Sequence, residues 1–415
     1  MNTLQQEFDS ILHERVGARA VVERIIKKKF GDASIDLNQT QVQQIVNRIE
    51  NLRDGETIVN TNDIVAGKDS EISIVIDDED IETAINSMTA ALRDEYPKIV
   101  ENTAEILLKQ IERTAKTEVS GYRRDRKKFE RRLEKLWRLP LRLLELFQLL
   151  VIEAGDEFNK NYRPAASASH DLVFDVLTRL HARACQISSE VIVLLKAGLA
   201  DGGHARWRTL HEVAIVAMFI EKHGQDVADR YLSHAIVESY KGVLQYRNHH
   251  DALGLEPFPD DEFNAIQSEY QKALTKFGAE FRSDYGWASD ILKKKRPAFS
   301  DIEENVNLEK WRGHYKMASH NVHANPKGIM FKLGLAPQEK SILLAGVSTR
   351  GLADPAHGTA LSLLQITSTL LFTKRNLDTL VRCRILMGLQ REIGEAFLKV
   401  HHEIEQYESS LQAFE

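Results

Sequence analysis

The first group of residues suited to chemistry lies in the stretch HARWRTLHE. This stretch opens an otherwise apolar helical segment. Arg208 and Glu212 are one helical turn apart and can pair within the helix. Arg206 falls in the most apolar stripe and has no partner on its own helix, so it must find one across a helical bundle. An arginine beside a histidine suits acid–base chemistry on a phosphate ester, whereas the same arginines in a structural role would tie helices together. The candidate site residues here are Arg206, Arg208, His211 and Glu212.

A second polar cluster lies in WRGHYKMASHNVH, where polar residues recur at helical spacing. We expect this helix to end before Asn325 and Pro326, since proline disfavours helix for the residue before it. The last turn would then carry two histidines, and a helix C-terminus favours a protonated imidazole. Such groups can act as acid or base, or can simply cap the helix. The candidates are Arg312, Tyr315, Ser319, His320 and His323.

Two further stretches could contact anions. In the loop AGVSTRG, the residues Ser348, Thr349 and Arg350 precede a helix whose N-terminal N–H groups could hold an anion. The basic run YRRDRKKFERRLEKLWRL has one apolar face and basic remaining faces, which fits either a helix that contacts phosphate or RNA, or a solvated helix with arginine stems packed over apolar surface. Its candidate anion- or RNA-binding residues are Arg123, Arg124, Lys127 and Arg131.

Several reaction classes lack their motifs, since the chain has no HExxH, CxxC, GxSxG, GxxxxGK[ST] or GxGxxG. Glu212 with His320 and His323 could form a metal site, but their spacing is not specific for one. We expect no metal and no other cofactor.

The elements that must position these clusters are predicted to be almost entirely helical. HARWRTLHEVAIVAMFI is apolar on nearly every face from Val213 onward and should be the most buried helix, with chain breaks at Gly198 and at Gly202–Gly203. Alternating residues at 56–77 predict one β-hairpin. The polar, proline-containing stretch 159–169 reads as the main linker.

The predicted fold class is therefore mainly α, with a C-terminal helical bundle and a smaller N-terminal helical module that carries the hairpin. The N-terminal module, which we expect to contact a partner protein or a second copy, spans 1–100. Connecting helices, including the basic one, span 101–160. The all-helical bundle domain spans 165–415, and we expect the two polar clusters to meet within it in one polar pocket.

Composition places the chain among ordinary globular proteins, with 415 residues, 43% hydrophobic residues and a formal net charge of −6. That charge argues against a protein that coats nucleic acid over its whole surface. Neither a signal peptide nor a membrane-spanning segment is expected, and a cytoplasmic location follows as the expectation.

Three stretches, LLKAGLADGGHARWRTLHE, YKMASHNVHANPKG and AGVSTRGLADPAHGTALSLLQIT, together resemble an all-helical bacterial domain family, domain of unknown function 5677, over about residues 170–400. RWRTLH, with Arg206 and His211, also resembles the Arg-x4–6-His signature of HEPN-type helical ribonucleases. It departs from that signature at Trp207, where a polar residue is usual, and the two side chains project about 140° apart on a straight helix.

Two functions compete. The first is a cytoplasmic bacterial effector with an HEPN-like domain, a metal-independent endoribonuclease in phage defence or a toxin system, with RNA as substrate and assembly as a homo-oligomer. The second is a non-catalytic sensor or scaffold, whose polar helical core binds an anionic ligand or fixes helix packing and whose N-terminal module recruits a partner.

Overall fold

The computed structural model describes residues 4, 6, 17–51, 64, 74–336, 339 and 341–412. Within this part of the chain the regular structure is α-helix with short 3-10 turns, and no strand occurs. The prediction of a mainly α fold is confirmed. By its internal contacts the chain divides into a first unit, Met1–Tyr122, and a second unit, Arg123–Glu415.

Within residues 17–51 and 74–122, the first unit has two short helices and the beginning of a long one. Ile26 and Phe30 of α2 pack against Val42 and Ile45 of α3 in a small apolar core, and the Asn38 side chain caps α3. The helices are α2 (Ala18–Asp32), α3 (Gln39–Glu50) and α4 (Asp78–Leu136), the last of which continues into the second unit.

The predicted β-hairpin at 56–77 lies mostly outside the described residues. Its described end, 74–77, has no regular structure and leads into α4. Ile64, the other described residue of this range, is buried, and its carbonyl oxygen accepts a hydrogen bond from Gln41 Nε2 at 2.8 Å. The described residues therefore give the hairpin no support.

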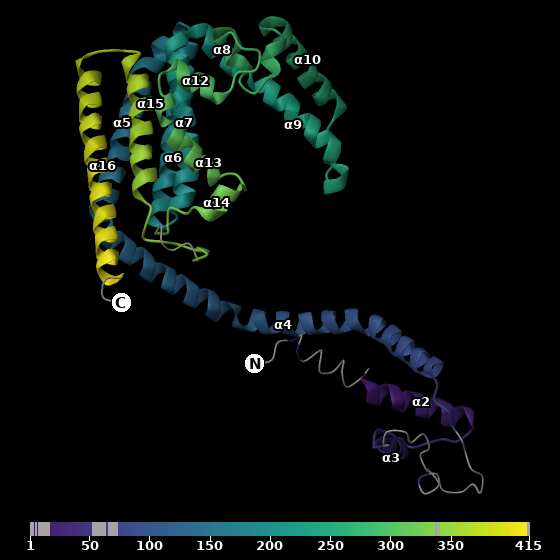
Figure 1. The fold of residues 1–415 in the computed structure, drawn as a ribbon. Coiled ribbons are helices and arrows are strands. Elements are labelled where there is room, and N and C mark those ends of the chain that lie inside the picture. Colours follow the sequence, from purple (N-terminus) through teal and green to yellow (C-terminus); the bar gives the residue numbers. More distant parts are fainter. Residues whose placement is uncertain are drawn as a thin grey trace. The chain divides into compact units, whose positions relative to one another are not determined.

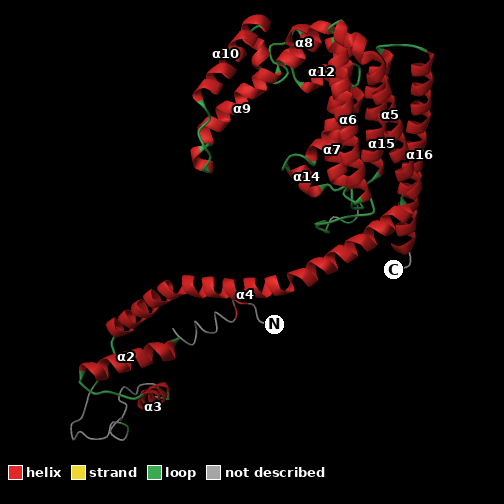
Figure 2. Cartoon of the chain, turned by 180° about the vertical axis from the view of Figure 1, so that it is seen from behind, coloured by secondary structure: helices red, strands yellow, loops and turns green. Residues whose placement is uncertain are grey.

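The second unit is built on five long helices that pack side by side (Figures 1 and 2). The helix α7 packs on α6 and α15, α15 also packs on α16, and α5 contacts α6, α15 and α16. One continuous apolar core runs through all five. Their bounds are α5 (Arg138–Ala168), α6 (Leu172–Lys196), α7 (Ala200–His223), α15 (Ala353–Phe372) and α16 (Leu377–Gln412).

Burial of α7 is as the sequence predicted, because Ala217 and Ile220 have no exposed surface and Val213 is 8% exposed. The predicted break at Gly198 is also present, with φ of 75°. The second predicted break was wrong, since α7 runs without interruption through Gly202 and Gly203. A Cβ added at Gly203 would lie 3.1 Å from a methyl carbon of Leu195, so glycine here serves close packing of α7 on α6.

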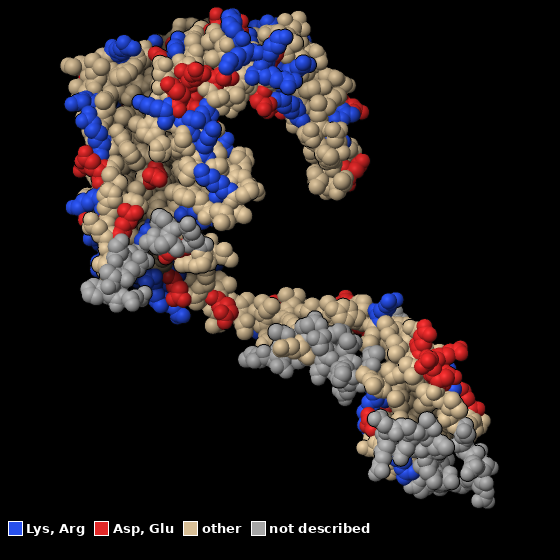
Figure 3. Space-filling view, viewed as in Figure 1, with Lys and Arg blue, Asp and Glu red and all other residues tan. Residues whose placement is uncertain are grey.

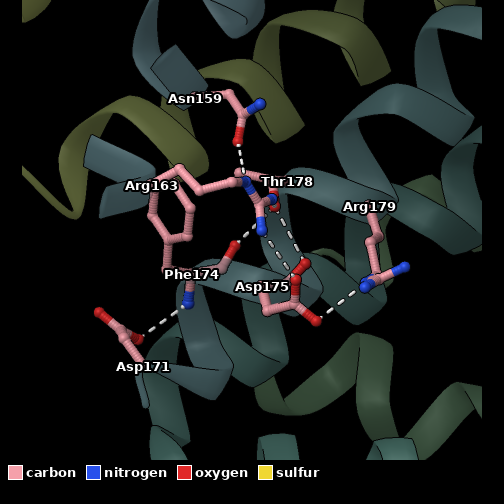
Figure 4. Close-up of polar contacts among 7 residues, drawn as sticks. All are labelled: Asn159, Arg163, Asp171, Phe174, Asp175, Thr178 and Arg179. Atoms are coloured by element: carbon pink, nitrogen blue, oxygen red, sulfur yellow. Dashed lines mark hydrogen bonds and ion pairs between the residues drawn. The ribbon is translucent and has the colours of Figure 1, made fainter. Parts of the chain in front are cut away.

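The stretch 159–169, predicted as the main linker, is instead the last part of α5, which continues through Pro164 to Ala168, and the division by contacts falls earlier, after Tyr122. The guanidinium of Arg163, the residue before this proline, ties α5 to α6 (Figure 4). It bonds to Asn159 at 2.7 Å, Asp175 at 3.2 Å and Thr178 at 3.0 Å.

Shorter helices follow α7 and supply the other side of the site. Both α12 and α13 pack against α7. The helix α13 ends at His320 rather than just before Asn325–Pro326. Asn325 caps the next helix by accepting a hydrogen bond from Gly328 N at 2.9 Å. These helices are α8 (Gln225–Ser233), α9 (Ala235–His249), α10 (Asp260–Phe277), α12 (Phe299–Asn305), α13 (Arg312–His320) and α14 (Pro326–Met330).

Candidate functional site

The first and second polar clusters meet where α13 packs on α7. Arg208 Nη2 donates a hydrogen bond to the hydroxyl of Tyr315 at 2.8 Å, and that hydroxyl donates to Glu212 Oε1 at 2.5 Å. Arg208 also pairs with Glu212 at 3.2 Å, one turn along the same helix, as its spacing predicted. The Arg208 guanidinium lies 4.8 Å from the centre of the Tyr315 ring. An arginine of α7 thus meets the polar face of α13.

A carboxylate that sequence reasoning missed extends this cluster. Glu303 of α12 has no exposed surface, and its two oxygens contact His211 Nε2 at 3.2 Å and the guanidinium of Arg312. His211 is itself only 2% exposed. Glu303 could have been found from the sequence, because it follows Ile302 within an apolar helical stripe where a carboxylate must have a partner. We call Arg208, His211, Glu212, Glu303, Arg312 and Tyr315 the polar network.

The polar network is balanced in charge, with two guanidinium groups facing two carboxylates. Burial raises the pKa of the Tyr315 hydroxyl, and its hydrogen bond to Glu212 raises it further. Tyr315 therefore stays protonated and acts as a hydrogen-bond donor to the carboxylate. Each charge has an opposite charge beside it, as buried charges require.

Arg206 lies outside the polar network. It pairs with Glu190 of α6, and its side chain keeps 30% of its surface exposed. Arg206 and Arg208 are two residues apart, which turns their side chains by about 200° around the helix. Arg206 does find a carboxylate across the bundle, but on α6 rather than α13.

The other candidates of α13 bond locally. Ser319 Oγ donates to the carbonyl of Tyr315 at 2.8 Å, and Asn325 Nδ2 lies 3.0 Å from His320 Nδ1. His323 lies in the turn beyond α13 and is exposed, so it was wrongly expected within the last helical turn. In the part of the chain that the structure describes, no three His, Cys, Asp or Glu side chains gather as metal ligands would.

The loop with Ser348, Thr349 and Arg350 is held by its own polar groups. Ser348 Oγ donates to the Gly334 carbonyl at 2.7 Å and accepts from the Arg350 N–H at 3.1 Å. The Thr349 carbonyl accepts from Trp137 Nε1 at 2.9 Å. These contacts fix the loop against the start of α5, and an anion-binding role for it stays a prediction.

The basic run forms the C-terminal end of α4, as its helical spacing predicted. Leu133 and Trp137 have no exposed surface and anchor it in the core of the second unit. The side chains predicted to bind anions or RNA are all exposed, and their binding role stays a prediction. They are Arg123, Arg124, Lys127 and Arg131.

Comparison with known proteins supports the resemblance to domain of unknown function 5677, and the resemblance to HEPN-type ribonucleases stays a prediction. Residues 174–340 match the model of a family described as a family of unknown function, DUF5677. The match runs from the first turn of α6 through α14 and contains the whole polar network. The loop with Ser348, Thr349 and Arg350 lies beyond it, as do α15 and α16. No curated protein and no solved structure matches the chain. None of the described helices is long and apolar enough to cross a membrane.

Proposed function

We propose that this protein is a non-catalytic sensor or scaffold whose polar helical core fixes the packing of α7, α12 and α13. The observation that carries the proposal is that each charged group of the polar network lies beside an opposite charge, although Arg208 Nε has no hydrogen-bond partner among the described residues. Glu303 is fully buried between His211 and Arg312, and Arg208 is engaged by both Tyr315 and Glu212. Such an arrangement orients helices, because any rotation of one would leave a buried charge without its partner.

The HEPN-like endoribonuclease is the competing proposal, and the same geometry disfavours it. Acid–base catalysis on an RNA ribose requires a histidine within hydrogen-bond reach of the 2′-hydroxyl. His211 is 2% exposed, and its Nε2 faces Glu303. Arg206, the other half of the RWRTLH signature, pairs with Glu190 on another face of α7.

An RNA cleavage assay separates the two. Purified full-length protein is incubated with total RNA in the presence of EDTA, beside Arg206→Ala and His211→Ala. A scaffold leaves the RNA intact, and His211→Ala lowers the melting temperature because Glu303 loses a partner. Cleavage by the wild type that both variants lose, with melting temperatures unchanged, would establish the ribonuclease instead.

The exposed apolar side chains of α4 in the first unit support the scaffold role. Val100, Leu107 and Ile111 fall on one face of the helix and are 51%, 39% and 62% exposed. An apolar face of this kind on a long helix suits contact with another protein or with a second copy of the chain.

Light scattering after size exclusion measures whether this face joins two copies. Leu107→Glu should lower the molar mass of a homo-oligomer, because it places a charge within the apolar face. Asn102→Glu adds the same charge on the opposite side of α4 and should leave the mass unchanged. Equal masses for the wild type and Leu107→Glu would leave a different partner protein as the occupant.

A further inference from the structure

A groove of about 690 Å³ lies between two loops of the second unit, away from the α7 segment where the sequence placed its site. Both loops belong to the connection between α10 and α12 and lie on either side of the short helix α11 (Ser289–Leu292). One carries Arg282 and Tyr285, and the other carries Lys295 and Arg296. Four cationic and two acidic side chains line the groove, which gives it a net positive charge: Lys241, Arg282, Lys295 and Arg296 with Glu280 and Asp284. On the face drawn in Figure 3, Lys and Arg gather over the region of α8 and α9, with Asp and Glu beside them over α12.

Three of the four cationic side chains that line the groove form no ion pair with a described carboxylate. Lys241 pairs with Asp284 at 2.8 Å, whereas Arg282, Lys295 and Arg296 have no ion pair among the described residues. Their neighbours in KKKR do not share this property, since Lys293 pairs with Asp290 and Lys294 with Asp301. Positive charge is therefore left unneutralised at the groove, whereas the neighbouring lysines of the same segment are neutralised by carboxylates.

Both loops are held in place by side chains that do not themselves line the groove. His234 Nε2 donates to the Ser283 carbonyl at 2.9 Å, which fixes the backbone beside Arg282. The other loop is anchored where Asp301 accepts from the Ala298 N–H at 2.8 Å and pairs with Lys294 at 2.7 Å. Walls held in this way lose little freedom when a ligand binds.

Tyr285 connects the groove to the polar network. It lines the groove, is half-buried, and its ring centre lies 6.4 Å from that of Phe299, which in turn lies 5.0 Å from that of Tyr315. Burial raises the pKa of the Tyr285 hydroxyl, the nearby Glu212 carboxylate raises it further, and the Arg208 guanidinium lowers it. A ligand in the groove would thus be separated from the polar network by the rings of Tyr285 and Phe299.

We propose that this groove binds the phosphate groups of a nucleotide, free or within single-stranded RNA, through Arg282, Lys295 and Arg296. Guanidinium groups match phosphate oxygens with paired hydrogen bonds, and lysine adds a point charge. The half-buried ring of Tyr285 offers a surface on which a base can stack. The volume of about 690 Å³ lies within the range of small-molecule sites. This site is separate from the buried pairing behind the scaffold proposal.

Binding by the full-length protein is measured with two probes, a fluorescent ATP analogue and a fluorescein-labelled single-stranded RNA of about ten nucleotides. The test variant is Arg282→Ala with Arg296→Ala. We expect it to weaken binding by at least about tenfold, because two charge-assisted contacts are lost. For RNA, the slope of log Kd against log salt concentration should fall by about 1.4, at about 0.7 for each phosphate contact. ATP binding would identify a free nucleotide as a ligand, and RNA binding alone would identify the strand.

A control variant matched in charge removes two exposed lysines, Lys293→Ala with Lys399→Ala. Both lysines pair with carboxylates, and neither lines the groove. This control should bind within about twofold of the wild type, because local rather than total charge decides the affinity. Tryptophan fluorescence melting checks that both double variants are folded. The proposal is overturned if the wild type binds neither probe, if both double variants lose affinity equally, or if polyglutamate displaces the probes as well as nucleotides do. None of these results would bear on the RNA cleavage and melting tests of the scaffold proposal.

Discussion

Removal of the Glu303 carboxylate is the most informative perturbation of the polar network. In Glu303→Ala, the guanidinium of Arg312 and the ring of His211 both lose their partner, and His211 is only 2% exposed. Breaking a buried ion pair from one side costs about 3–5 kcal/mol, because a charge stays buried without compensation. Arg312 keeps 26% of its side-chain surface exposed, so water recovers part of this loss. We therefore expect the free energy of unfolding to fall by about 3 kcal/mol.

The neighbouring residue supplies the matched control. Glu304 is exposed on the same short helix, so Glu304→Ala removes the same group at a cost of less than about 0.5 kcal/mol. All four tryptophans, Trp137, Trp207, Trp287 and Trp311, lie in the second unit. Urea unfolding followed by tryptophan fluorescence therefore reports on the unit that holds the network.

A loss below about 1 kcal/mol in Glu303→Ala, or a loss equal to that of Glu304→Ala, would refute the structural role of the network. Glu303→Gln adds a test of charge against shape. It keeps the size of the side chain but removes its charge, so it should also be destabilising, though by less than Glu303→Ala, because the amide oxygen can still accept a hydrogen bond.

Further predictions concern other positions of the second unit and use the same unfolding assay. A Cβ at Gly155 would lie 2.3 Å from the His181 ring, so Gly155→Ala should destabilise the unit by more than about 1 kcal/mol. Gly388 has open space around it, so Gly388→Ala should instead stabilise the unit by up to about 1 kcal/mol. Burial lowers the pKa of His181 from 6.5 to about 4, so the unfolded chain takes up this proton first and stability should fall as pH falls from about 6.5 to about 4; a His181→Gln variant that falls as steeply would contradict this. Arg206→Ala should cost less than about 1 kcal/mol, as expected for a partly exposed pair, and Arg208→Ala about 1–3 kcal/mol; the reverse order would overturn their assignment.

Periodicity within single helices was enough to predict the mainly α fold and the burial of α7. Val213, Ala217 and Ile220 belong to a segment that is apolar on nearly every face, and such a helix has no solvent-facing side. The pairing of Arg208 with Glu212 was also local, because residues four apart are neighbours on any helix. These properties depend only on the geometry of one helix, so they could be read from the chain.

Tertiary structure alone decided which polar groups meet between helices. The sequence marked Arg206 as the arginine that most needed a distant partner, but α7 is rotated so that Arg208 faces α13 and Arg206 faces Glu190 of α6. The stretch 159–169 has the composition of a linker, yet it is helical as far as Ala168, and Arg163 within it bonds across to α6. The rotation and axial position of each helix are set by the packing of the whole bundle, and the residue pattern of any one helix does not contain them.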